Sequence, residues 1–128
     1  AKYYVDVHPP LAKLLITLAA WLGGFKGNFE FKEIGAIFFA DVPYVAMRMV
    51  PAVLGVLLVP ITYITLRALD CSASSSLLGA VLVLFENGLI TQSRHILLDS
   101  QLMFFTGLSV LFWVMFCNED RRPVTKAP

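Results

Sequence analysis

Residues 49–66 read MVPAVLGVLLVPITYITL, eighteen consecutive residues without a charge. A helix needs about 20 mostly apolar residues to cross the roughly 30 Å hydrocarbon core of a bilayer. This run therefore predicts a transmembrane helix, which extends back to position 42 if Arg48 is tolerated. Pro51 and Pro60 would break a helix in water, but spanning helices accept proline where neighbouring helices satisfy the freed backbone groups.

Two further apolar runs follow. Residues 71–90 (CSASSSLLGAVLVLFENGLI) contain Glu86 as their single charge, and residues 100–117 (SQLMFFTGLSVLFWVMFC) contain none. The alternative to membrane helices is three buried core helices of a large soluble protein, for which too few charges remain to form a wetted face. The sequence thus predicts transmembrane helices at 42–66, 77–90 and 100–117, with loops at 67–76, 91–99 and 118–128.

The composition agrees with a membrane protein. Of the 128 residues, 58% are hydrophobic and 15% charged, whereas soluble domains are about half apolar and a quarter charged. The net charge of +1 gives no basic surface for nucleic acid, so we expect no such partner. Two cysteines are too few for a disulfide framework, and we expect Cys71 and Cys117 to be free thiols. Because the chain shows no initiator methionine and no signal-peptide start, we interpret it as an internal piece of a longer protein.

Residues 1–41 form the first predicted loop, which contains no run long enough to span. Pro9-Pro10 favour a helix start, and the leucines at positions 11, 14, 15, 18 and 22 share one helical stripe. This pattern predicts an amphipathic helix at 11–24 that lies in the membrane interface, with Trp21 at headgroup level. A slight excess of Lys and Arg places loops 67–76 and 118–128 in the cytosol, and loops 1–41 and 91–99 outside or in a lumen.

Ionisable residues gather on the predicted non-cytosolic side, and such a set suits the binding of a charged lipid phosphate and a polar co-substrate. The residues are Asp6, His8, Arg48, Glu86, Arg94 and Asp99. Structural interpretations compete: Arg48 reaching to the headgroups, Glu86 as a hydrogen-bonded helix-end residue, and Asp99 as an N-cap. The sequence contains no standard catalytic or phosphate-binding motif. The residues alone therefore leave two classes open, a lipid-substrate enzyme and a transporter or scaffold subunit.

Several short motifs occur together and in order: DVHPPLAK at 6–13, GFKGNF at 24–29, VPY and MR within 42–48, EN at 86–87, TQSR at 91–94 and ILLDS at 96–100. With these motifs the chain resembles the eukaryotic protein O-mannosyltransferases, which are dolichyl-phosphate-mannose–protein mannosyltransferases. The residues of its motifs are closer to those of fungal than of animal members. The resemblance runs over essentially the whole chain. It implies an all-α polytopic protein of the endoplasmic reticulum membrane, a GT-C type glycosyltransferase fragment with an interfacial amphipathic helix followed by three transmembrane helices.

The resemblance also implies an activity, the transfer of mannose from dolichyl-phosphate mannose to Ser or Thr hydroxyls of secretory-pathway proteins. The reaction inverts the sugar carbon, and members work as pairs of related subunits. The family's acidic Asp-Glu pair, which supplies the expected general base, lies upstream of the HPP motif. This sequence begins after that point, so we expect the fragment alone to be inactive.

The resemblance implies roles for the ionisable residues. His8, Arg48 and Arg94 are candidates for binding the donor phosphate, Arg48 and Asp99 for supporting catalytic roles, and Asp6 and Glu86 are further candidates. Arginine suits a phosphate because it stays charged and can bind in a bidentate fashion. Cations held in a dry cavity stabilise the charge that develops on the departing phosphate, and a carboxylate activates the acceptor hydroxyl. This scheme calls for no cofactor besides the donor substrate, and it leaves the part of a divalent metal open.

Overall fold

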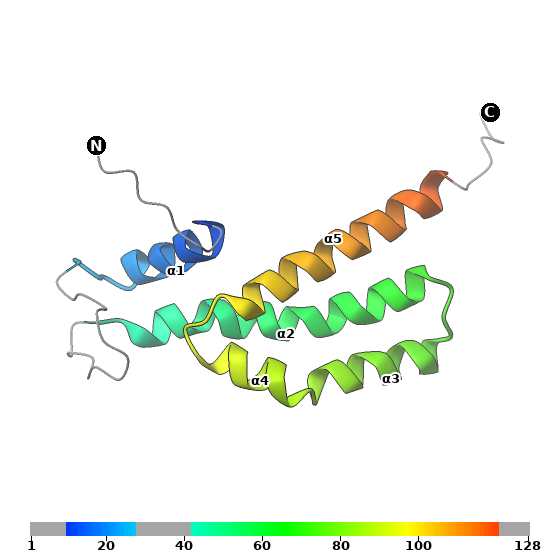
Figure 1. Cartoon of the computed structure of the whole chain (residues 1–128), viewed down its shortest axis with the longest axis horizontal. Helices are drawn as coiled ribbons and strands as arrows, with labels where there is room; N and C mark the ends of the chain where they lie inside the picture. Colours follow the sequence, from blue (N-terminus) through cyan, green and yellow to red (C-terminus); the bar gives the residue numbers. More distant parts are fainter. Residues whose placement is uncertain (1–9, 28–41, 121–128) are drawn as a thin grey trace.

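The computed structural model describes residues 10–27 and 42–120 of the chain, and every regular element in these two ranges is an α-helix. The predictions for residues 1–9, 28–41 and 121–128 lie outside the described residues. The helices, shown in Figure 1, are α1 (Pro10–Leu22), α2 (Tyr44–Ala68), α3 (Ala73–Leu84), α4 (Asn87–Arg94) and α5 (Asp99–Asp120). The expected all-α fold is thereby confirmed.

Helix α2 is the longest element, and its 25 residues extend about 37 Å at 1.5 Å per residue. It runs without interruption through Pro51 and Pro60. The hydroxyls of Thr62 and Thr65 donate to the carbonyls of Leu58 (2.9 Å) and Ile61 (2.7 Å), so neither leaves its hydrogen-bonding capacity unused in an apolar helix. The mean hydropathy of 2.1 and the length together qualify α2 as a membrane span.

The second apolar run differs from the single expected helix at 77–90. Helix α3 begins earlier, at Ala73, because the Ser72 hydroxyl accepts the amide hydrogen of Ser75 (3.2 Å) and caps it. It ends at Leu84, and α4 then starts at Asn87 and continues through Arg94, into the expected loop. The two helices are bent by 51° at the break. Their lengths along the two helix axes sum to about 30 Å. By length and composition, the part of the chain that the structure describes has two uninterrupted spans, or three if this bent pair counts as one.

Helix α5 is the last span, and its 22 residues with mean hydropathy 1.7 extend about 33 Å. It packs along α2, where Gly107 faces the Leu58 side chain. At the far end, the Asn118 side-chain amide donates to the carbonyl of Ala68 at 2.5 Å. This bond joins the end of α5 to the end of α2 across fifty residues of sequence.

Helix α2 is the centre of the fold, because each of the other four helices packs against it (Figure 1). Helix α1 joins through Ile16 and Ala20, which are buried in one cluster with Val42 and Met47. The leucine stripe faces elsewhere: Leu11, Leu14, Leu18 and Leu22 are exposed, as is Trp21. The helix thus packs through Ile16 and Ala20 and leaves most of the predicted leucine stripe exposed.

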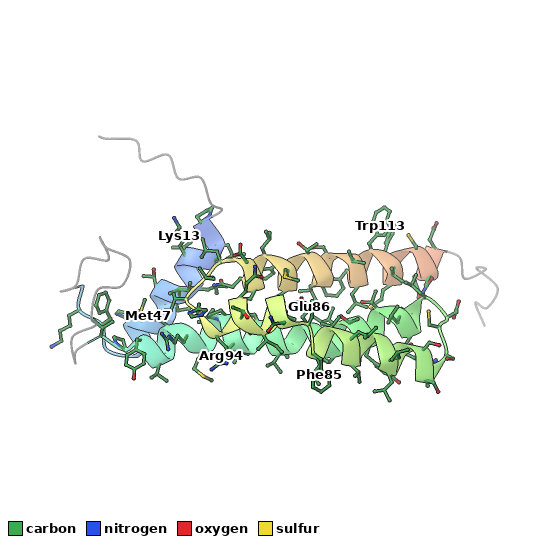
Figure 2. All side chains as sticks on the ribbon, turned by 60° about the horizontal axis from the view of Figure 1, so that its bottom comes forward. Lys13, Met47, Phe85, Glu86, Arg94 and Trp113 are labelled. Carbon is green, nitrogen blue, oxygen red and sulfur yellow. The ribbon has the colours of Figure 1, made fainter. Side chains whose placement is uncertain are left out.

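The spans bury little of their apolar surface within the chain. In the most apolar 18-residue windows of α2 and α5, only 17% and 22% of the residues are buried. Figure 2 shows Phe85 and Trp113 pointing away from the bundle on opposite sides, and their exposed fractions are 73% and 67%. Core helices of a soluble protein bury such side chains, so this exposure favours helices that face lipid or further membrane helices. Cys71 and Cys117 are free thiols, as expected.

Candidate functional site

Three of the candidate residues lie toward one end of the bundle. Arg48 is in the first turns of α2, Arg94 is the last residue of α4, and Asp99 is the first residue of α5. Because the chain reverses between α2 and α3 and again between α4 and α5, these three positions come to the same end, which we call the site end (Figure 1). Asp6 and His8 fall outside the described residues.

Arg48 is exposed, and its guanidinium lies 5.6 Å from the centre of the Tyr44 ring, one turn earlier in α2. An arginine over an aromatic face is held by the ring quadrupole while its N–H groups stay available to an anion. Among the described residues, Arg48 forms no ion pair with a carboxylate. The Tyr44 ring thus orients the side chain, and no carboxylate within residues 10–27 and 42–120 neutralises it.

Helix α4 packs against α2, and the two helices come especially close at Gly55 and Ser93. A Cβ atom added at Gly55 would lie 2.7 Å from the Cβ of Ser93, so the two backbones approach as closely as a glycine allows. Arg48 precedes Gly55 by seven residues, which is two helical turns, and therefore lies on the same side of α2. Arg94 follows Ser93 directly. Both arginines thus lie toward the site end, Arg94 as the last residue of α4 and Arg48 about 10 Å of helix beyond Gly55.

Asp99 faces a different part of the site end. Its exposed carboxylate lines a cleft of about 200 Å³ between α1 and α5, together with Leu11, Ala12 and Phe105. The N-cap position of α5 belongs to Leu98, whose carbonyl accepts the amide hydrogen of Leu102 at 3.1 Å. Asp99 therefore lies in the first turn, where a negative charge complements the helix dipole. The structure thus sets the Asp99 carboxylate on the side of α1.

Glu86 lies away from the site end, at the break between α3 and α4. Its carboxylate caps α4: Oε1 accepts the amide hydrogen of Gly88 at 3.0 Å, and Oε2 accepts that of Leu89. Figure 2 shows Glu86 near the middle of the bundle and Arg94 nearer the site end. The interpretation of Glu86 as a hydrogen-bonded helix-end residue is confirmed, and both oxygens are committed to backbone donors.

Two buried polar residues were not among the sequence candidates. Ser100 and Gln101, in the first turn of α5, have no exposed surface, and Gln101 also lines the cleft beside Asp99. The Ser100 hydroxyl and both polar atoms of the Gln101 amide lack a hydrogen-bond partner in the described part of the chain. The available signal was a Ser-Gln pair between Asp99 and an apolar run. Within residues 10–27 and 42–120, no group of three or more His, Cys, Asp or Glu side chains is placed to hold a metal ion.

Comparison with known proteins gives the family. The family model described as dolichyl-phosphate-mannose-protein mannosyltransferase matches residues 1–127. The chain belongs to this family. The match includes both arginines and Asp99, as well as Asp6 and His8.

Individual mannosyltransferases agree with the family match. The chain is 45% identical over 114 residues to dolichyl-phosphate-mannose–protein mannosyltransferase 1 of Candida albicans, covering 89% of this chain and 13% of that protein. It is 47% identical over 108 residues to the protein of the same name from Saccharomyces cerevisiae (84% and 13%) and 44% identical over 115 residues to mouse protein O-mannosyl-transferase 1 (90% and 15%). Fungal and animal relatives are thus about equally similar. The chain spans only about one-seventh of the length of these relatives.

Proposed function

We propose that this chain is part of a membrane enzyme that transfers mannose from dolichyl-phosphate mannose to Ser or Thr hydroxyls of secretory-pathway proteins. The observation that carries the proposal is the family match over residues 1–127. The apolar helices support it, because a dolichyl-linked donor is held in a membrane and its enzyme must reach it there. The proposed location is the endoplasmic reticulum membrane, the proposed architecture is of GT-C type, and the proposed working unit is a pair of related subunits.

In this proposal Arg48 and Arg94 bind the phosphate of the lipid donor. Both are exposed, and both lie toward the site end, Arg48 near the start of α2 and Arg94 at the end of α4. Departure of the polyprenyl phosphate leaves negative charge on its oxygens. The two arginines can stabilise this charge, because neither is paired with a carboxylate among the described residues. No resident cofactor is needed for this step.

Asp99 takes a supporting role on the acceptor side. Its carboxylate lies in the cleft between α1 and α5, away from the arginines, so it does not neutralise them. A carboxylate in this position can hold a hydroxyl or an amide hydrogen of the acceptor peptide. The general base that removes the acceptor proton is proposed to come from the remainder of the full-length protein, so the fragment alone is proposed to be inactive.

The test uses the full-length protein in membranes, with dolichyl-phosphate mannose and a Ser/Thr-rich peptide. Transfer of mannose is measured for the wild type, Arg48→Ala, Arg48→Lys and Asp99→Asn. Arg67→Ala is the matched control, because Arg67 is an exposed arginine at the opposite end of the same helix. Assembly of each variant is followed by size-exclusion chromatography.

The expected result is that Arg48→Ala lowers transfer about a hundredfold in normally assembled protein, while Arg67→Ala stays near the wild type. Arg48→Lys keeps the charge but loses bidentate geometry, so it falls between the two. A well-assembled wild type that transfers no mannose, with its partner subunit supplied, would contradict the proposed function and favour a transporter or scaffold.

A further inference from the structure

The break between α3 and α4 leaves backbone groups without helical partners in the middle of an apolar segment. The first amide hydrogens of α4 point out of its N-terminus, and no carbonyl of α3 is in line with them because the helices are bent by 51°. In an apolar environment such groups need a partner from within the protein. The partner present here is the side chain of Glu86.

The geometry of this partner is that of a complete N-cap. Glu86 has extended backbone angles (φ −69°, ψ 115°), and its two carboxylate oxygens accept the amide hydrogens of Gly88 and Leu89. Gly88 makes room for it, because an added Cβ would lie 3.1 Å from each oxygen. One side chain thus satisfies the amides at the second and third positions of α4.

The cap is coupled to the site end because α4 is short. Arg94 is the last of its eight residues, so the cap and the arginine are separated by about 12 Å of helix. Between them, Leu89 is buried and Ser93 is in close contact with Gly55 of α2. A helix this short is barely stable by itself, so its register against α2 depends on these fixed points.

We infer that Glu86 is a positioning residue for Arg94: by capping α4 at the break, its carboxylate holds α4 in register against α2 and thereby fixes the place of Arg94 at the site end. The inference rests on the proposed function for the role of the two arginines. It assigns Glu86 no contact with donor, acceptor or reacting atoms. The competing interpretation is that the Glu86 carboxylate itself is required, as a charge or as a proton acceptor.

Two substitutions separate the interpretations. Glu86→Ser removes the carboxylate but supplies a hydroxyl that still caps α4 at its second or third position, whereas Glu86→Ala removes both charge and cap. The matched pair therefore differs in capping alone. The loss of an N-cap shifts local helix formation by about 2- to 30-fold, so the effect of Glu86→Ala is measurable.

The register of α4 is read out independently of activity. Val56 on α2 and Ile90 on α4 line the same groove, so cysteines at these positions, in a cysteine-free background of the full-length protein, report the contact by the rate of cross-linking with a short bifunctional reagent. A cysteine pair at Ala68 and Asn118, which join α2 and α5, is the control for the rest of the bundle. Mannose transfer is measured on the same Glu86 variants without the added cysteines.

The expected result is that Glu86→Ser stays within twofold of the wild type in both assays. In the Glu86→Ala variant, the Val56→Cys and Ile90→Cys pair cross-links at least fivefold more slowly, with the control pair unchanged. Its kcat/KM for the lipid donor falls by at least the same factor, while KM for the peptide acceptor is unchanged, because the displaced group faces the donor phosphate.

Several results would overturn the inference. The first is a Glu86→Ala protein that equals the wild type in either assay, and the second is a Glu86→Ser protein that cross-links as slowly as Glu86→Ala. The third is a Glu86→Ser protein that cross-links normally but loses transfer, which would show that the carboxylate itself is needed. If the wild type transfers no mannose, the proposed function fails together with the role given to Arg94. The cross-linking series then still decides whether Glu86 holds α4.

Discussion

The close contact between α2 and α4 predicts that Gly55→Ala lowers stability although alanine is the better helix former. The new Cβ would lie 2.7 Å from the Cβ of Ser93, whereas carbon atoms in contact are about 3.5–4.0 Å apart. The Ser93 Cβ is fixed to its backbone and cannot turn away, so α2 and α4 must separate by about 1 Å. Gly107→Ala is the control, because the neighbouring Leu58 methyl, also at 2.7 Å, lies at the end of a flexible side chain.

The magnitude follows from two opposing effects. Overpacking of this kind costs about 1–3 kcal/mol, and replacing a helical glycine by alanine returns at most about 1 kcal/mol. We therefore expect Gly55→Ala to lower the free energy of unfolding by about 1 kcal/mol and Gly107→Ala to leave it unchanged or slightly higher. The assay is unfolding of the purified full-length protein in mixed micelles with increasing SDS, followed by circular dichroism.

A double-mutant cycle isolates the contact. Ser93→Gly removes the Cβ that meets the new methyl, so Gly55→Ala in the Ser93→Gly background no longer suffers the clash. The coupling energy between the two positions should be about 1–3 kcal/mol. Additive effects, or a Gly55→Ala protein as stable as Gly107→Ala, would refute the reasoning that α4 is held against α2 at this point.

Three further predictions use the same unfolding assay. Gln101→Leu should raise the free energy of unfolding by about 1–3 kcal/mol, because the buried amide has no partner in the described ranges; a lower stability would show that the amide is paired in the full-length protein. Asn118→Ala removes the bond to the carbonyl of Ala68 and should lower stability by about 0.5–1.5 kcal/mol, and an unchanged value would mean that water replaces the bond. Ser72→Ala should cost about 1 kcal/mol while Ser72→Asp retains the cap of α3, and equal values for the two variants would argue against capping.

Run length was sufficient to predict the uninterrupted spans. The apolar runs at 49–66 and 100–117 lie within α2 and α5, because about 20 apolar residues in a row have few alternatives to a spanning helix. The bend in the second run could not be predicted from hydropathy, which averages over the single residue that creates it. The local signal was the sequence Glu86-Asn87-Gly88, a capping side chain followed by a turn-forming pair.

The sequence predicted which residues lie at the site end, but it did not predict which helix each of them faces. The topology of three crossings was enough to bring Arg48, Arg94 and Asp99 to one end. That Asp99 faces α1 and that α4 packs on the Gly55 side of α2 follows from contacts such as Gly55 with Ser93, which carry no periodic signal. The buried Gln101 was missed because an isolated polar residue at the start of an apolar run is usually exposed.

The central position of α2 has a consequence for biogenesis. This helix precedes α3, α4 and α5 in the chain, so during synthesis it leaves the ribosome before each of them. At about 5–20 residues per second, the roughly fifty residues from the end of α2 to the end of α5 take about 3–10 s to follow. Each later helix then emerges after α2 and can pack against it. Helix α5 is the last of them to emerge and completes the bundle.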